Sequence, residues 1–389
     1  MNVTLFLRKI MKKYFETTDS LFSISAPKLK EYISSFNEPV NDAERSFYQY
    51  KCTLFRMNTL GRTLVKLSGM VLYLPYLIKI RSNSASFEKT YDAVFMTDGI
   101  SLSTIPSSLV QKFPNIVQVP FGMRMCMNEE DVRFSKAITR DYRFHLYFKL
   151  KLIMKLGMYS AIIEQYRPKA IISYAESSFT SSILTKYCED KGIEHISIMH
   201  GERIFNLKTS FFRFSNYYVW DNFYIKLMTK LRCASDQYIV EVPPSVSGTI
   251  VNDAMVPKYF MTYYLEAEGE DTLLLIREAL QMLKNNNKKC SLRIHPRAGN
   301  SELVHRILGE FDIQTAKDTT LNDSLANTDY VASVVSTVLF EGWVKGKKVI
   351  IDNYCQKSYY EKLKELDYIM LTKPHLLLAD IIDNLQGAS

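Results

Sequence analysis

One segment, from Ala170 to Gly201, constrains the fold of this 389-residue chain more than any other. It opens with the apolar run Ala170–Tyr174, continues with a helix-patterned stretch over Thr180–Lys191, and closes with a second apolar run from Glu194. Two short apolar runs joined by a helix pair side by side as parallel strands with a right-handed crossover. The segment therefore predicts a βαβ unit, and with it a parallel sheet covered by helices.

Strand and helix patterns alternate in the same way along both halves of the chain. A single core rarely grows beyond about 250–300 residues, so a chain of 389 residues is expected to form two domains. We predict an α/β fold with two Rossmann-like lobes, a cleft between them, and a helical, basic region at residues 1–90. The N-terminal lobe is expected to span residues 1–210 and the C-terminal lobe residues 211–389, because the irregular, aromatic stretch Phe211–Ser215 interrupts the pattern. Two-lobed epimerases and binding proteins share this pattern, so it does not by itself select a function.

A histidine follows one strand of the predicted C-terminal lobe. The run Cys290–Ile294 reads as a short strand, and Pro296 ends it because proline has no N–H and a fixed φ. This places His295 at a carboxyl edge, where ligands bind in open α/β sheets, between Arg293 and Arg297. An imidazole can donate a proton near neutral pH, and arginines bind phosphate oxygens. Alternatively, the histidine only caps a surface loop.

A hydroxyl-rich turn follows about forty residues later. Tyr330–Val335 reads as a buried strand with Ser333 inside it, Ser336 and Thr337 stand where a helix N-cap belongs, and Val338–Val344 reads as the helix. The start of a helix presents unpaired N–H groups and the positive end of the helix dipole to an anion. Ordinary helix capping is the alternative. Together with the preceding histidine, the turn predicts a two-point anion site in one domain.

The order and spacing of these two motifs resemble the carboxyl-terminal half of the bacterial sialyltransferases of the lipooligosaccharide and polysialic-acid types, which have the GT-B architecture. In that family the His-Pro histidine and the Ser/Thr turn engage the phosphate of a CMP-sugar. An acidic residue of the amino-terminal domain, often within an Asp/Glu–Asp/Glu–Gly motif, is the general base. This sequence matches that motif at Asp98 and Gly99 but has Thr97 in place of the first acid, and two valines separate Ser333 from Ser336.

The resemblance implies an inverting glycosyltransferase that moves a nonulosonic acid, such as sialic acid, from a CMP-sugar to an oligosaccharide or glycolipid acceptor in bacterial surface-polysaccharide or lipooligosaccharide synthesis. It implies Asp98 as the general base and His295 as the phosphate partner and general acid. The donor-binding residues are then Arg293, Pro296, Arg297, Ser333, Ser336, Thr337 and Glu341. Because a CMP leaving group carries a single phosphate, neither a metal ion nor a cofactor is expected.

Two other residues, Glu176 and His200, compete with Asp98 for the role of base. Glu176, His200 and Gly201 follow the two strands of the βαβ unit, so the topology brings them to one sheet edge. A strand-terminal His-Gly, followed later by His-Pro and a Ser/Thr turn, also resembles the CDP-glycerol glycerophosphotransferases of wall-polymer synthesis, with the first histidine as base. A third hypothesis is a GT-B lobe pair kept as a non-catalytic scaffold in polysaccharide assembly.

The positive charge of the chain is concentrated near its start. The net charge is +8, and residues 1–90 hold 14 Lys or Arg against 7 Asp or Glu. The sequence has no zinc finger, glycine-aromatic RNA-binding signature or recognisable helix-turn-helix, so nucleic acid is not the expected partner. Basic residues punctuate a first apolar helix and flank the apolar run Gly69–Ile78, which Pro75 interrupts. We expect this region to lie on the inner face of the cytoplasmic membrane or to be a solvated basic surface over a core helix.

The six cysteines and six histidines are scattered. No CxxC pair occurs, and most of the cysteines lie in or beside apolar segments, where cysteine is usually a small buried hydrophobe. This pattern favours a reduced, cytoplasmic compartment and gives no zinc site.

Overall fold

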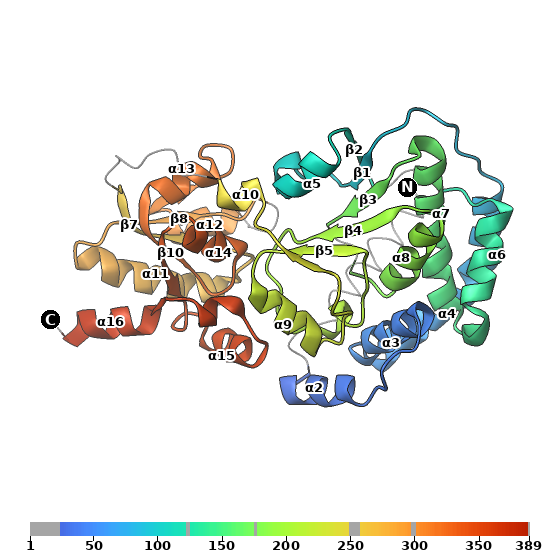
Figure 1. The fold of residues 1–389 in the computed structure, drawn as a ribbon. Helices are drawn as coiled ribbons and strands as arrows, with labels where there is room; N and C mark the ends of the chain where they lie inside the picture. The colour runs from blue at the N-terminus through green and yellow to red at the C-terminus, as the bar shows by residue number, and fades with distance from the viewer. Residues whose placement is uncertain (1–23, 122–124, 175–176, 249–256, 297–300, 388–389) are drawn as a thin grey trace. The chain divides into compact units, whose positions relative to one another are not determined.

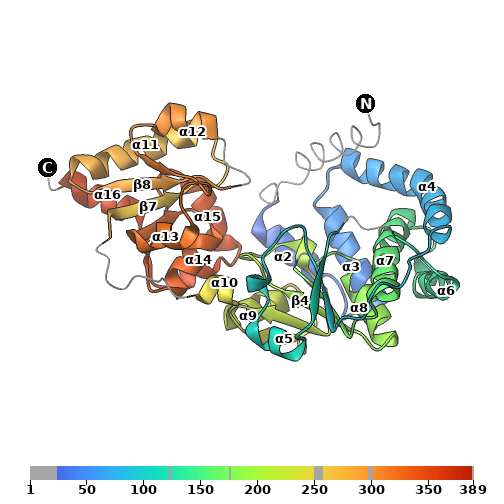
Figure 2. The ribbon, with the colours of Figure 1, turned by 90° about the horizontal axis from the view of Figure 1, so that it is seen from above.

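The computed structural model describes residues 24–121, 125–174, 177–248, 257–296 and 301–387, which divide into two compact units (Figures 1 and 2). Unit 1 takes the described residues up to His200 together with Phe205–Pro243, and unit 2 takes Gly201–Ile204 and the described residues from Pro244. Each unit holds a six-stranded parallel sheet with helices around it. The prediction of an α/β chain with two Rossmann-like lobes is therefore confirmed. The predicted apolar helix around residues 8–13 lies outside the described residues.

Among the described residues, the elements of unit 1 begin with the helices α2, α3 and α4 and then alternate between helices and strands. They are α2 (Ala26–Ser34), α3 (Asp42–Phe55), α4 (Thr59–Arg81), β1 (Ala93–Met96), η1 (Leu102–Thr104), α5 (Ser107–Lys112), β2 (Ile116–Val119), α6 (Glu129–Ile138), η2 (Arg140–Tyr142), α7 (Leu146–Tyr166), β3 (Ala170–Ser173), α8 (Ser181–Asp190), β4 (Glu194–Ile198), η3 (Leu207–Thr209), β5 (Asn216–Val219), α9 (Asn222–Lys230) and β6 (Tyr238–Val240). The strand order is β2-β1-β3-β4-β5-β6.

The two faces of this sheet carry different helices, because successive side chains of a strand point to opposite faces. Val94 and Met96 belong to a core with α7 and α8, whereas Ala93 and Phe95 belong to a core with α5. Helix α3 adds an outer layer by packing Phe47 and its neighbours on α7 and α8. All of these strands are paired in parallel, as the segment from residue 170 to residue 201 predicts.

The boundary between the units lies later in the chain than the sequence predicts. Residues 211–243, assigned to the C-terminal lobe, form β5, α9 and β6 and complete the sheet of unit 1. The aromatic stretch that suggested a boundary is instead core: Phe211, Phe212 and Phe214 are fully buried. The backbone N–H of Phe214 donates to the side chain of Gln237 over 2.8 Å, which ties the stretch to the start of β6.

Unit 2 is built around one central strand. Its elements are α10 (Pro244–Ser247), β7 (Tyr259–Tyr264), α11 (Glu270–Asn285), β8 (Cys290–Arg293), α12 (Ser301–Leu308), β9 (Asp312–Gln314), α13 (Leu321–Ala326), β10 (Thr328–Ser333), α14 (Thr337–Val344), β11 (Lys348–Ile351), α15 (Lys357–Glu365), η4 (Ile369–Thr372), β12 (Leu376–Leu377) and α16 (Leu378–Gly387). The strand order is β12-β11-β10-β7-β8-β9, and every pair is parallel.

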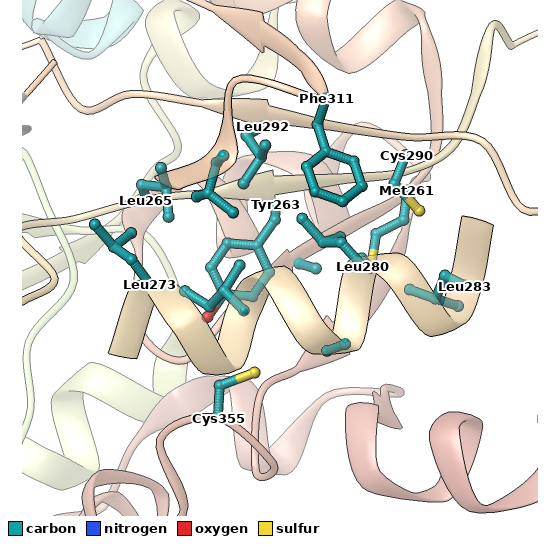
Figure 3. Close-up of a cluster of buried hydrophobic side chains, with 14 of the residues drawn as sticks. Met261, Tyr263, Leu265, Leu273, Leu280, Leu283, Cys290, Leu292, Phe311 and Cys355 are labelled. Atoms are coloured by element: carbon teal, nitrogen blue, oxygen red, sulfur yellow. The ribbon is translucent and has the colours of Figure 1, made fainter. Parts of the chain in front are cut away.

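The core of unit 2 fixes the position of β7. Figure 3 shows Met261 and Tyr263 of β7 pointing toward helix α11, where they meet Leu273, Leu280 and Leu283. On the other face of the sheet, α14 lies so close to β10 that a Cβ atom on Gly342 would stand 2.8 Å from the Val331 side chain. Helix packing on both faces therefore holds the carboxyl ends of these strands in place.

Candidate active site

The order of strands in unit 2 creates one distinctive place at the edge of its sheet. From β7 the chain moves through β8 to β9 on one side, and then returns to start β10 on the other side of β7. Such a reversal opens a crevice at the carboxyl ends of the strands, where ligands of open α/β sheets bind. The predicted site residues after β8 and after β10 therefore flank the end of β7.

His295 and Pro296 lie at this edge, directly beyond β8. Ile294 still pairs with β9, because its backbone N–H donates to the carbonyl of Gln314 over 3.0 Å. His295 is half-buried and Pro296 is exposed, so the strand ends where proline requires it to. Two strand spacings, about 10 Å, separate the ends of β8 and β10, a span that an imidazole and a bound phosphate group together can bridge. Arg297 lies outside the described residues.

The hydroxyl-rich turn forms the N-terminus of α14, as predicted. Ser336 is the N-cap, and its Oγ accepts from the backbone N–H of Val338 over 3.4 Å. Ser333 is buried at the end of β10, where its hydroxyl donates to the Val335 carbonyl over 3.5 Å. Thr337 Oγ1 accepts from a backbone N–H of unit 2 over 3.4 Å. The serine side chains thus build the turn, and the start of α14 is aimed at the same edge as His295.

Arg293 is built into the sheet edge. It is 8% exposed, and its Nη2 donates to the Thr319 carbonyl over 2.9 Å, which ties β8 to the loop before α13. Burial lowers the pKa of Arg293, while Tyr264 and Asp323 oppose that effect. The guanidinium therefore supplies positive charge beneath the edge and stabilises the loop on which α13 begins.

Glu202 is a component of this site that the sequence analysis did not identify. Its two carboxyl oxygens are inaccessible to solvent. Burial raises the pKa of Glu202 well above its ordinary value, and the neighbouring carboxylates of Glu266 and Glu341 raise it further, whereas Tyr368 opposes them. Burial also raises the pKa of Glu341, to about 7. The start of α14 is therefore bordered by carboxyl groups whose pKa values are raised above the ordinary one.

A pocket of about 240 Å³ opens beside these groups. Glu266, Ala267 and Glu268 follow β7, and Val334 and Val335 follow β10. Glu268 Oε1 accepts from the Glu266 backbone N–H over 2.9 Å, and burial raises the pKa of Glu268. Carboxylates accept hydrogen bonds, so this pocket suits groups that donate them. It is lined by Glu266, Ala267, Glu268, Val334, Val335, Gln356 and Tyr359.

The predicted residues of unit 1 occupy the carboxyl edge of its own sheet. Asp98 is exposed just beyond β1, in a turn completed by Gly99 at φ +84°, and its Oδ1 accepts from the Phe121 backbone N–H over 3.1 Å. The Phe121 ring meets the Tyr174 ring edge-on at 5.7 Å, and Tyr174 meets the His200 ring edge-on at 4.6 Å. A continuous row of side chains thus joins the ends of β1 and β4. Glu176 lies outside the described residues, and Gly201 belongs to unit 2.

Comparison with known proteins gives distant structural neighbours. No protein-family model and no curated protein matches the chain. UDP-GlcNAc 2-epimerase from Neisseria meningitidis aligns with a TM-score of 0.46 and 12% identity over 77% of this chain and 91% of its own. A variant of the wall teichoic acid polymerase TagF aligns with a TM-score of 0.45 and 12% identity, over 90% of this chain and 89% of its own. A glycosyltransferase from Rickettsia africae aligns with a TM-score of 0.41 and 12% identity, over 77% of this chain and 100% of its own.

Proposed function

We propose that this protein is an inverting glycosyltransferase that uses a CMP-activated nonulosonic acid as donor and a surface glycan as acceptor. The observation that supports this proposal is the strand reversal of unit 2. It gathers a histidine, a capped helix N-terminus and a polar pocket around the end of a single strand, β7. Binding a nucleoside monophosphate requires three elements: a partner for the phosphate, the positive end of a helix dipole, and a pocket for the nucleoside.

In this proposal the phosphate of the donor lies between His295 and the start of α14. The backbone N–H groups at the helix start and the hydroxyl of Thr337 stabilise its negative charge, and Arg293 adds positive charge from beneath. As the bond between the anomeric carbon and the phosphate oxygen breaks, the electron pair leaves with CMP. His295 stabilises the charge that develops on that oxygen, or donates a proton to it.

The nucleoside lies in the pocket lined by Glu266 and Glu268. Ribose hydroxyls and the exocyclic amino group of cytosine both donate hydrogen bonds that carboxylates accept. Uracil carries a carbonyl oxygen in place of that amino group, so an acidic pocket discriminates in favour of cytidine nucleotides. Burial raises the pKa of both Glu202 and Glu341, which lowers the repulsion between these carboxyl groups and a bound phosphate.

The acceptor hydroxyl requires a base, and we assign that role to Asp98. A carboxylate held by one backbone N–H, on an exposed turn, can take the proton of the acceptor hydroxyl as its oxygen attacks the anomeric carbon. A single displacement of this kind inverts the configuration at that carbon.

A panel of nucleotides tests the donor class. CMP and CDP should raise the thermal midpoint of the full-length protein, UMP and UDP should raise it less, and GDP should leave it unchanged. A midpoint that responds to UDP or GDP but not to CMP would overturn the proposal. In the variants Glu266→Gln and Glu268→Gln, the shifts of the thermal midpoint caused by CMP and by UMP should differ less than in the wild type.

A second candidate is supported by a different residue, His200. Its ring lies at the carboxyl end of β4 against Tyr174, where a histidine base would stand in a CDP-glycerol glycerophosphotransferase. Both reactions release CMP, so nucleotide release does not separate them. The protein should be incubated with an acceptor and either CMP-sialic acid or CDP-glycerol, and the product weighed. A mass gain of one sialic acid supports the first proposal, and a gain of one glycerol phosphate replaces it with the second.

A further inference from the structure

Helix α4 is apolar on two opposite sides, and only one of them is covered. Gly61, Val65, Gly69 and Ile80 are its buried residues and lie on one side. At Gly69 the helix approaches α7 so closely that an added Cβ atom would stand 2.4 Å from the backbone nitrogen of Tyr147. Helix α4 therefore rests on the start of α7 through small residues and is held there along its length.

The opposite side of α4 carries a second apolar stripe. Its six residues recur at intervals of four and three, which places them on one face of a helix. They are between 42% and 69% exposed, although every one is a large aliphatic residue. The stripe consists of Leu60, Leu64, Leu67, Val71, Leu74 and Ile78.

Pro75 does not interrupt this stripe. The sequence pattern predicts a short apolar run broken at Pro75, but α4 continues through this proline and extends over 23 residues. Its length and composition would allow it to cross a membrane. The close contact of Gly69 with α7 keeps one side of the helix on the protein, so the exposed stripe is suited to lie along a surface.

The charge around the stripe has one sign. From residue 45 to residue 87 the sequence contains no Asp or Glu, and it contains seven basic residues: Arg45, Lys51, Arg56, Arg62, Lys66, Lys79 and Arg81. Four of these belong to α4 itself and are exposed. The positive field reaches the loop before α7, because Lys51 and Lys66 add to burial in lowering the pKa of His145.

An exposed aromatic residue lies just before the end of α7 that packs on α4. Phe144 is 81% exposed and stacks under the guanidinium of Arg143 at 4.8 Å. It stands two residues before α7, whose first residues Leu146 and Tyr147 touch Gly69 of α4. An aromatic ring with a cation beside it is a common anchor at the boundary between lipid headgroups and acyl chains.

We propose that the exposed stripe of α4, with Phe144, docks this protein on a membrane surface that contains anionic lipid. The aliphatic side chains enter the boundary between headgroups and acyl chains, and the basic residues contact lipid phosphates. Each Lys or Arg near an anionic surface contributes about 1 kcal/mol, and the aliphatic stripe adds the burial of its area. A second copy of the chain is the other partner that such a stripe could accept. Two copies of α4 would bring eight positive charges together with no acidic partner in either helix, which disfavours self-association.

Flotation with lipid vesicles tests this proposal on the full chain. Vesicles of phosphatidylcholine alone are compared with vesicles containing one quarter phosphatidylglycerol, at low and at high salt. The variant Val71→Asp/Leu74→Asp places two negative charges in the stripe. The matched control is Leu274→Asp/Leu275→Asp, which alters two aliphatic residues of α11 that are 42% and 40% exposed. Circular dichroism and thermal midpoints confirm that both variants fold.

The wild type and the α11 control should float with the anionic vesicles, and salt should weaken their binding. The α4 variant should lose at least about tenfold in partition coefficient. The proposal is overturned if the wild type does not float at low salt, or if the α4 variant floats as well as the wild type. It is also overturned if the lipid-free protein is a dimer in sedimentation equilibrium that the α4 variant dissociates, since the stripe would then serve a second copy. Since none of these measurements uses a nucleotide, their outcome is independent of the proposed activity.

Discussion

The backbone N–H of Glu202 donates to the hydroxyl oxygen of Thr337 over 3.4 Å. Gly201 lies against the same hydroxyl, because a Cβ atom added there would stand 3.4 Å from it. A short piece of chain that follows β4 in sequence is thereby fixed to the first residue of α14. This contact explains why the Glu202 carboxyl lies beside that of Glu341, one helical turn further along α14.

Removing the hydroxyl of Thr337 should weaken the site. We expect Thr337→Val to lose about 1 kcal/mol of stability, the value of one hydrogen bond, and about tenfold in CMP affinity. Thr337→Ser keeps the hydroxyl and should retain both. Isothermal titration with CMP measures the affinity, and an unchanged dissociation constant in Thr337→Val would remove this residue from the phosphate site.

His295 is expected to contribute to the reaction and not to the stability of the fold. His295→Ala should lower turnover at least about a hundredfold, the usual contribution of a general acid. Because the residue is half-buried at a strand end, the thermal midpoint should change little. Full turnover in this variant would refute the assignment.

Two substitutions in unit 1 separate the candidate bases. Asp98→Asn keeps the acceptor of the Phe121 N–H and should abolish turnover while CMP binding persists. His200→Gln should then reduce turnover by no more than about tenfold. The reverse result, an active Asp98→Asn and an inactive His200→Gln, would favour the histidine base of the glycerophosphotransferase alternative. Loss of CMP binding in Asp98→Asn would instead identify Asp98 as a structural turn residue.

The buried carboxyl of Glu341 makes stability depend on pH. Its pKa is raised from 4.5 to about 7 by burial, so the folded protein holds the proton more tightly than the unfolded chain does. The resulting stabilisation is full below about pH 4.5 and is lost as the pH rises through about 7. Urea unfolding at pH 5 and pH 8.5 measures how far the free energy of unfolding falls between the two pH values. In Glu341→Gln this fall should be smaller than in the wild type, by at most about 3 kcal/mol. Glu202 should add a decline of the same sign, so some pH dependence should persist.

Close packing of α4 on α7 predicts a large effect of one added methyl group. Gly69→Ala would place its Cβ atom 2.4 Å from a backbone nitrogen, which side-chain movement cannot relieve. We expect a loss of about 1–3 kcal/mol in the free energy of unfolding. Ser68→Ala changes the preceding residue of the same helix, which is half-buried, and should stay within about 0.5 kcal/mol. Equal stability of the two variants would contradict the observed approach of the helices.

The local part of the fold could be predicted from the sequence. The strands that end near Ser173, Ile198 and Ser333 are short apolar runs with turn residues on both sides, and all three form at the expected places. The cap at Ser336 is also observed, because a serine before an apolar helix has few other local roles. These features depend on residues close together in the chain.

Features that depend on distant contacts were not predicted. The sequence analysis did not identify β7, although the run Tyr259–Tyr264 has the aromatic and β-branched character of a strand, and so the acidic pocket after it was missed. The role of Glu202 could not be predicted from its neighbours in sequence, because Glu341 and Tyr368, which act on its carboxyl group, lie more than a hundred residues away. The predicted domain boundary at residue 210 is wrong for the same reason, because only the complete sheet shows that β5 and β6 belong to unit 1.

The assignment of Gly201–Ile204 to unit 2 has a consequence for how the chain can be divided. Any cut at the junction before Pro244 separates α14 from Gly201–Ile204, of which Gly201 and Glu202 lie against Thr337 at the start of that helix. A fragment beginning there would expose Thr337 to solvent and leave the Glu341 carboxyl without its acidic neighbour. The two units are thus interlaced in sequence: residues 1–243 contain all of unit 1, but a stretch that contains all of unit 2 must also include residues 205–243 of unit 1.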